Sequence, residues 1–172
     1  MLYSTLLTGT EPIGALPAGP SWECWRAGRT EGRLLGGVIN RIALNQATRF
    51  ALPLERFDGA VLFWEEAGGH ASHVWSYLQV LRHAGILDRI CGMVVGIPAA
   101  IEGLDSPEGS PPLRETVLDA LGDRDRDIPV LGNAGPNLPL PVGTRVALDA
   151  QLRTLSLLEP AVRPLTVTGP GS

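Results

Sequence analysis

Lysine is absent from the sequence, and its absence excludes one large class of nucleotide-binding proteins. Arginine supplies all 14 basic residues, against 18 acidic residues, and the formal net charge is −4. A phosphate-binding P-loop requires a lysine, so the chain contains no such loop. A weakly acidic chain without a basic stripe also argues against nucleic acid and anionic membranes as partners.

Long apolar runs and cysteines are equally scarce. No uninterrupted apolar run approaches the roughly 20 residues of a membrane-spanning helix. The only thiols, Cys24 and Cys91, lack C-x-x-C spacing and are typical of small core residues in a reducing compartment, with one disulfide as the alternative. The N-terminus lacks the basic start and the apolar stretch of a signal peptide. We therefore expect a cytoplasmic protein with no membrane partner.

The length and composition predict one globular domain. With 172 residues, 44% of them apolar, the chain can bury a core but is too short for two full enzymatic domains. Residues 1–20 include a stretch rich in Thr, Gly and Pro from Leu7 to Pro20, which predicts a linker or arm without helix or strand. Residues 21–160 form the expected domain, and residues 161–172 a flexible tail.

A strand, helix, strand unit is predicted between Val61 and Val95. The apolar run that begins at Val61 predicts a buried strand, and the β-branched run from Ile90 predicts a second one. Between them, apolar residues recur at helical spacing from an N-cap at Ser72 to a C-cap at Gly85. The short crossover predicts that the two strands are parallel.

The remaining elements are predicted to be short. They are strands at Trp22–Trp25 and Glu31–Leu35, the second broken by Gly36-Gly37, a short helix over 39–47, a helix at Leu113–Leu121, a strand at Val130–Leu131, and a hairpin of Thr144–Asp149 and Thr154–Leu158.

Two adjacent acids close the first strand of the central unit and are candidates for a site. Glu65 and Glu66 follow the buried run, and α/β proteins place their sites at such strand ends. A carboxylate there could orient a histidine or act as a general base. An ordinary polar strand end is the alternative.

The sequence contains few signs of a metal site or of an activated nucleophile. His70 and His73 lie close to the two acids, but their spacing matches no helical zinc signature, and we interpret neither as a ligand. The sequence contains no G-x-S-x-G elbow and no G-x-G-x-x-G fingerprint. We expect no metal and no cofactor, and any attacking group must come from a partner or another segment.

Several segments, taken in order, resemble the C-terminal domain of a serine carboxypeptidase family. This family contains the cytoplasmic LD-carboxypeptidases of peptidoglycan recycling and the immunity peptidases that cleave microcin C. The segments are Gly32-Arg-Leu-Leu-Gly-Gly37, Val61-Leu-Phe-Trp-Glu-Glu66, the stretch from Tyr77 to Leu87, Gly92-Met-Val-Val-Gly96, and Leu140-Pro-Val-Gly143 leading to Leu148-Asp149. Together they cover most of residues 28–159.

The resemblance implies a fold and a triad residue. The fold is α/β, a layered mixed sheet with two main helices, in the manner of the family's swivelling β/β/α C-terminal domain. In the family, an N-terminal domain carries the nucleophilic serine, and the C-terminal domain carries a glutamate and a histidine. The family's strand ending F-L-E-D falls on Phe63-Trp64-Glu65-Glu66 and assigns the triad glutamate to Glu65. Its implied role is to orient the imidazole and stabilise the imidazolium.

The position of the family's histidine carries an asparagine. The family has a Gly-His pair eight residues before the proline of its later L-P-x-G pattern, and counting back from Pro141 gives Asn133, preceded by Gly132. No histidine follows His83, so no shift of the alignment restores one. An amide does not titrate and cannot shuttle a proton.

Two hypotheses about function remain open. The first is the C-terminal half of an LD-carboxypeptidase-like peptidase, which contributes Glu65 and needs a Ser-bearing domain or separate polypeptide as its partner. Its substrates would be muropeptides or peptide–nucleotides cleaved near a C-terminus. The second is a non-catalytic binding or structural relative that self-associates as a homodimer. In both cases the isolated chain is expected to be inactive.

Overall fold

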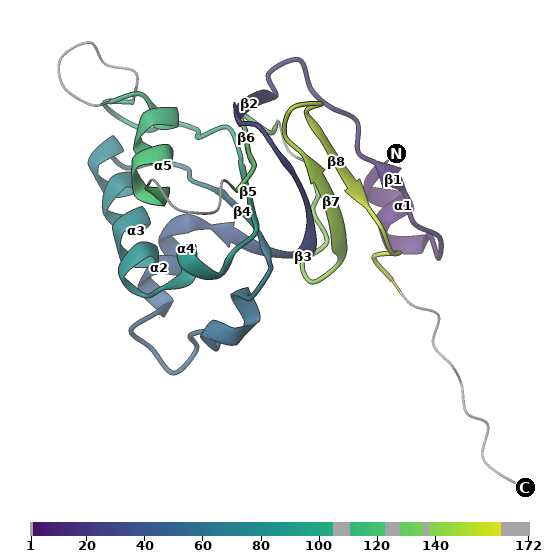
Figure 1. The fold of residues 1–172 in the computed structure, drawn as a ribbon, viewed down its shortest axis with the longest axis horizontal. Coiled ribbons are helices and arrows are strands. Elements are labelled where there is room, and N and C mark those ends of the chain that lie inside the picture. The colour runs from purple at the N-terminus through teal and green to yellow at the C-terminus, as the bar shows by residue number, and fades with distance from the viewer. Residues whose placement is uncertain (1, 105–110, 123–127, 136–137, 163–172) are drawn as a thin grey trace, which may run out of the picture.

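The computed structural model describes residues 2–104, 111–122, 128–135 and 138–162 (Figure 1). The helices are α1 (Leu2–Thr8), α2 (Ile39–Asn45), α3 (Ala71–His83), α4 (Ile86–Arg89) and α5 (Leu113–Leu121), with a 3-10 turn η1 at Leu54–Phe57. The strands are β1 (Gly14–Ala15), β2 (Glu23–Arg26), β3 (Arg29–Val38), β4 (Val61–Glu65), β5 (Gly92–Val95), β6 (Val130–Gly132), β7 (Arg145–Asp149) and β8 (Thr154–Leu157).

The strands form one eight-stranded mixed sheet in the order β1-β8-β7-β3-β4-β5-β6-β2. Strands β3, β4, β5 and β6 are parallel, whereas β2 pairs antiparallel with β6. Strand β3 joins the parallel strands to the antiparallel ones. Its residues 29–33 pair antiparallel with β7, and its residues 34–38 pair parallel with β4. The predicted α/β fold with a layered mixed sheet is confirmed.

Helices cover the two faces of the sheet unequally. Helices α2, α3, α4 and α5 lie on one side of the parallel strands β4 and β5 (Figure 1). On the other side lie α1 and the β7–β8 part of the same sheet, whose side chains share a core cluster with Val61 and Val94. Side chains of strand β4 alternate between the two faces of the sheet. Leu62 and Trp64 are buried in the core cluster under the helices, and Val61 is buried in the cluster on the opposite face. Burial on both faces explains the continuous apolar run of this strand.

The predicted central unit is confirmed. Strands β4 and β5 are parallel, with Val61 opposite Gly92, and α3 forms the crossover between them. The predicted N-cap was wrong by two residues, because His70 caps α3 and accepts the backbone N–H of Ser72 through its ring nitrogen Nδ1. Gly85 follows the helix at φ +78°, a left-handed conformation that glycine adopts readily.

Gly36 and Gly37 do not break β3, contrary to the prediction. The strand runs through both glycines to Val38. A Cβ atom at Gly36 would collide with the carbonyl oxygen of Phe63 on β4, so the glycine permits close approach of the two strands.

The N-terminal segment forms elements that the composition did not predict. Helix α1 and strand β1 lie within residues 1–20, and the side chains of Leu6 and Leu16 are buried against the second core cluster. The prediction that Leu7–Pro20 contains neither helix nor strand was therefore wrong. The predicted tail falls almost wholly on residues 163–172, outside the described residues.

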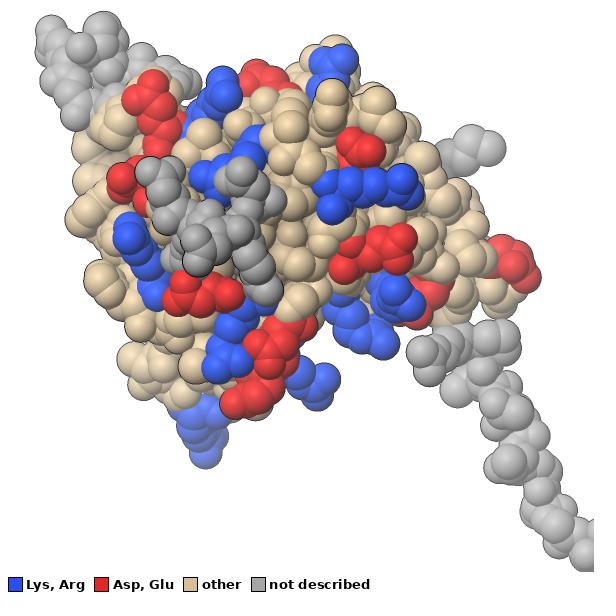
Figure 2. Space-filling view, in the orientation of Figure 1, with Lys and Arg blue, Asp and Glu red and all other residues tan. Residues whose placement is uncertain are grey.

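The surface and the thiols add two observations. Arginine and acidic side chains intermingle on the face drawn in Figure 2, and neither sign gathers into a continuous patch. Cys24 and Cys91 are both free and half-buried.

No helix among the described residues has the length and apolar character needed to cross a membrane.

Candidate functional site

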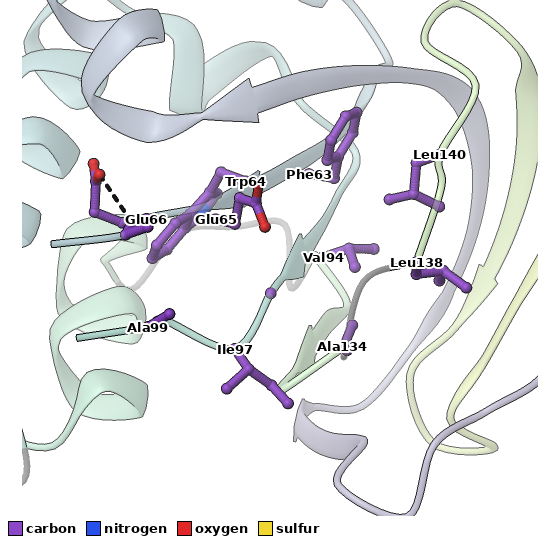
Figure 3. A pocket seen from close by; sticks show the side chains of 13 residues that line it. Phe63, Trp64, Glu65, Glu66, Val94, Ile97, Ala99, Ala134, Leu138 and Leu140 are labelled. Carbon is purple, nitrogen blue, oxygen red and sulfur yellow. Dashed lines mark hydrogen bonds between the residues drawn. The ribbon is translucent and has the colours of Figure 1, made fainter. Parts of the chain in front are cut away.

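A pocket lies where β4 and β5 end, and we call it the Glu65 pocket. Its volume is about 530 Å³. It is lined by Phe63, Trp64, Glu65, Glu66, Ala67, Val94, Gly96, Ile97, Ala99, Ala134, Gly135, Leu138 and Leu140 (Figure 3). The carboxyl ends of parallel strands are where open α/β sheets place their ligands, so the pocket is the first candidate site.

The two adjacent glutamates of this pocket have opposite environments. Glu66 is 3% exposed, and its carboxylate accepts the backbone N–H of Asn40 at 3.1 Å, the Asn40 side-chain amide at 2.9 Å and the backbone N–H of Ala67 at 3.0 Å. Both carboxylate oxygens therefore accept hydrogen bonds, which offset the free-energy cost of burying a polar group. Glu66 therefore ties the end of β4 to the start of α2.

Glu65 is free. Its side chain is exposed. Within the described chain, no residue donates a hydrogen bond to its carboxylate or forms an ion pair with it. Figure 3 shows this carboxylate directed into the hollow, whereas that of Glu66 points away from it. Successive residues of a strand face opposite sides, and this alternation separates the two acids.

Asn133 lies beside this pocket and contacts a different acid. Its Nδ2 donates to Oε1 of Glu23 at 2.9 Å, and its backbone carbonyl accepts the hydroxyl of Ser21 at 3.0 Å. Asn133 has φ +52°, a left-handed conformation that asparagine tolerates better than most residues. This arrangement fixes the turn that follows β6 against β2.

Glu65 and Asn133 belong to neighbouring pockets. A second pocket of about 320 Å³, the Asn133 pocket, is lined by Glu23, Trp25, Ile97, Pro98, Leu104, Pro112, Leu113, Arg114 and Asn133. Ile97 lines both pockets, so the two hollows adjoin at its side chain. The structure thus brings the two predicted site residues into one region, and within the described chain no hydrogen bond joins them.

Glu23 is an acid of this region that the sequence did not reveal. Hydrogen bonds from the Trp25 indole and then from Asn133, together with the charge of Arg114, hold the pKa of the Glu23 carboxyl below its ordinary value against a smaller opposing effect of desolvation. The indole bond is 3.0 Å long. No sequence pattern links Glu23 to Asn133, because the contact spans 110 positions.

The histidines lie outside both pockets. His70 and His73 belong to the cap of α3, where His73 Nδ1 lies 3.5 Å from the backbone nitrogen of His70. Among the described residues, no group of three or more histidine, cysteine or acidic side chains is placed to hold a metal ion. Neither histidine is close enough to line the Glu65 pocket.

The fold and the pocket define an α/β domain with a pocket at the carboxyl edge of its parallel strands. Residues 31–148 match the family model described as the LD-carboxypeptidase C-terminal domain, and the chain belongs to that family.

Relatives of known name agree with this assignment. The chain is 32% identical over 157 residues to a Synechocystis protein named as a candidate carboxypeptidase, a match that covers 85% of this chain and 48% of that protein. It is 24% identical over 138 residues to the microcin C7 self-immunity protein MccF of Escherichia coli, covering 77% of this chain and 38% of that protein. The chain thus spans about half the length of the Synechocystis protein and less than half the length of MccF.

Solved structures share the fold. MccF as an inactive mutant without ligand superposes with a TM-score of 0.78 at 19% identity, covering 94% of this chain and 54% of that one. MccF in complex with aspartyl sulfamoyl adenosine gives a TM-score of 0.77 at 19% identity, covering 94% of this chain and 55% of that one. The predicted kinship with the C-terminal domain of this family is confirmed.

Proposed function

We propose that this chain forms the carboxylate-bearing half of an LD-carboxypeptidase-type hydrolytic site. Glu65 supplies the acid of a Ser-His-Glu triad, and a Ser-bearing domain, in the same polypeptide or a separate one, supplies the nucleophile and the opposite wall. The bond cleaved is a peptide bond near a C-terminus, in a muropeptide or a peptide–nucleotide.

The observation that carries this proposal is the free carboxylate of Glu65, directed into a pocket at the carboxyl edge of the sheet. A triad acid must be free to accept the imidazole N–H and to stabilise the imidazolium that forms when serine is deprotonated. Glu66 cannot take this role, because its oxygens already accept three N–H groups.

The base is the missing component. Asn133 stands where the family's histidine is expected, and an amide has no proton to exchange near neutral pH. Removing one triad member lowers kcat by several orders of magnitude. The chain therefore contributes Glu65 to the site without hydrolysing substrate alone.

The test is reconstitution with the Ser-bearing domain of the Synechocystis relative. Release of terminal D-alanine from a murein tetrapeptide is measured for each polypeptide, for the mixture, and for the mixture containing Asn133→His. We expect release only with Asn133→His, and its loss when Glu65→Gln is added. Release by the chain alone, or release that persists after Glu65→Gln, would contradict the proposal.

A second candidate function is a non-catalytic relative that self-associates. A shallow groove between α2 and α3 is lined by Ala43, Leu44, Gln46, Ala47, Trp75, Ser76, Gln79, Val80, His83 and Ala84. Leu44, Trp75 and Val80 are 58%, 49% and 41% exposed, and large exposed apolar surfaces commonly mark contacts between proteins.

Light scattering after size-exclusion chromatography decides this second candidate. A dimer that Trp75→Glu converts to a monomer, while Tyr3→Glu on the distant helix α1 leaves it intact, would favour the second candidate. A monomer at high concentration would eliminate it.

A further inference from the structure

Helix α3 begins at a cap made by a histidine ring. The backbone N–H of Ser72 donates to Nδ1 of His70 at 3.2 Å, and the Ser72 hydroxyl lies 2.9 Å from the same nitrogen. A backbone N–H group can only donate, so Nδ1 must offer a lone pair. The cap therefore requires the neutral imidazole of His70, with its proton on Nε2.

The segment that ends in this cap also holds a loop against the start of the helix. The backbone N–H of Ala71 donates to the carbonyl of Glu102 at 2.9 Å, and that of Glu102 donates to the carbonyl of Gly69 at 2.8 Å. A Cβ atom at Gly103 would lie 2.9 Å from Nε2 of His70. The backbone of loop 96–104 thus packs directly against the imidazole ring.

We propose that His70 is a pH-sensitive switch for this edge of the domain. Neutral His70 caps α3 and holds loop 96–104 in place, whereas protonation of Nδ1 removes the acceptor and releases both contacts. Because Ile97 and Ala99 of the loop line the Glu65 pocket, the release loosens one wall of that pocket. This inference goes beyond the proposed hydrolytic function, since it requires neither a nucleophile nor the carboxylate of Glu65.

The charges around His70 favour release on acidification. Protonated His70 places a positive charge at the N-terminus of α3, where the helix dipole is also positive. The ring of His73 lies 6.3 Å from that of His70, so a second protonation brings two like charges together. Tyr77, on the other side of His73, is neutral in this range. Glu102 is the only charged residue of loop 96–104, and its attraction for a protonated ring opposes the release.

The contact between Ser72 and His70 belongs to the cap and does not create a nucleophile. The backbone N–H groups of Ala71, Ser72 and His73 already donate to acceptors within this segment. They are therefore unavailable to stabilise an oxyanion, which acyl transfer to a serine would require. Both rings are exposed to solvent, so protons reach them without any rearrangement.

Nitrogen-15 NMR of the imidazole rings tests the first step in the full chain. At pH 7.5 we expect the His70 ring in its neutral form, with the proton on Nε2 and none on Nδ1. A ring that carries its proton on Nδ1 at this pH would overturn the proposal, because such a ring cannot accept the N–H of Ser72.

Amide hydrogen exchange at pH 7.5 and pH 5.0, corrected for the intrinsic effect of pH, tests the release itself. Imidazole side chains titrate between about pH 5 and 8. We expect protection of residues 71–73 and 99–103 to fall about fivefold at pH 5.0, an effect typical of losing an N-cap. Residues 145–157 of β7 and β8, which lie outside the cap and the loop, should change by less than about twofold.

Matched substitutions separate the switch from other effects of acid. Asparagine is a favoured N-cap that does not titrate, so His70→Asn should keep its protection at both pH values. His83→Asn makes the same change at the last residue of α3 and should retain the wild-type response to pH. Near-UV circular dichroism at pH 7.5 checks that each variant is folded.

Two results of the exchange measurement would overturn the proposal. They are wild-type protection of residues 71–73 and 99–103 that does not change with pH, and a change with pH that survives His70→Asn in a folded protein. Neither measurement uses a Ser-bearing domain. Failure of this proposal and failure of the proposed function are therefore distinguishable.

Discussion

The side-chain amide of Asn133 donates a hydrogen bond to the carboxylate of Glu23, with Nδ2 and Oε1 2.9 Å apart. The bond joins the turn after β6 to the edge strand β2, whose register with β6 shifts between Cys24 and Arg26. In this chain Asn133 therefore has a structural contact. The same contact makes the stability of this edge depend on the charge of Glu23.

We predict that Glu23 makes the protein more stable at neutral pH than under acidic conditions. Its carboxyl has a pKa below the ordinary 4.5 when folded, so the native state favours the charged form. This contribution is fully present above the unfolded pKa and is lost as the pH falls through the folded pKa. Wild type should exceed Glu23→Gln in free energy of unfolding at pH 7, by less than about 1 kcal/mol because the group is exposed.

Urea unfolding of both proteins at pH 7 and pH 3 measures this difference. The gap between wild type and Glu23→Gln should shrink at the lower pH. Glu31→Gln serves as a control for removing an exposed acid, because Glu31 lies on β3, in the middle of the sheet order and away from β2, and pairs with Arg145 at 3.3 Å. A gap that widens on acidification would contradict the assignment.

Truncation of the two adjacent glutamates should change the free energy of unfolding by very different amounts. Glu66→Ala leaves the N–H groups of Asn40 and Ala67 without their acceptor in a buried site, and we expect a loss of about 3 kcal/mol in the free energy of unfolding. Glu65→Ala removes an exposed side chain without a partner and should change stability by less than about 0.5 kcal/mol.

The matched pair is measured by urea unfolding at pH 7 under identical conditions. Equal losses for the two variants, or a larger loss for Glu65→Ala, would show that the two side chains have been assigned to the wrong roles.

Gly132→Ala should destabilise the junction of β6 and β2. A Cβ atom there would overlap the indole ring of Trp25, which is 5% exposed and has little room to move. We expect a cost of at least about 2 kcal/mol, as for overpacking in a core. Gly135→Ala is the control, because its Cβ would meet Cδ1 of Ile97 at 3.0 Å, the end of an exposed and flexible side chain.

Thermal and urea unfolding compare these two glycine variants with wild type. The packing argument at Trp25 would be refuted by a Gly132→Ala protein as stable as Gly135→Ala.

The central part of the fold was predictable because its sequence signals are local. The apolar run of β4, the helical spacing of α3 and the β-branched run of β5 each reflect burial of that element, and all three elements are confirmed. The end of β3 was missed because glycine carries no side chain to mark a strand, although Gly36 is required there by the close approach of Phe63.

The remaining features depend on contacts between distant segments. Helix α1 is short and weakly marked, and its place in the fold is fixed by burial of Leu6 against the second core cluster. The apolar run from Val61 placed both glutamates at the strand end, and the family resemblance pointed to Glu65. The sequence did not reveal that Glu65 is exposed whereas Glu66 is buried. The bond between Asn133 and Glu23 has no sequence signature, because the two residues meet only when β2 pairs with β6.

The central claim is that the Glu65 pocket is one wall of a shared site. Amide hydrogen exchange measured by mass spectrometry tests this claim most directly. Exchange is compared for the chain alone and for the chain with the part of the Synechocystis relative that this chain does not match. We predict slower exchange in peptides covering residues 63–67 and 96–99, with no change in α2 and α3. Protection confined to α2 and α3, with the pocket peptides unchanged, would contradict the account.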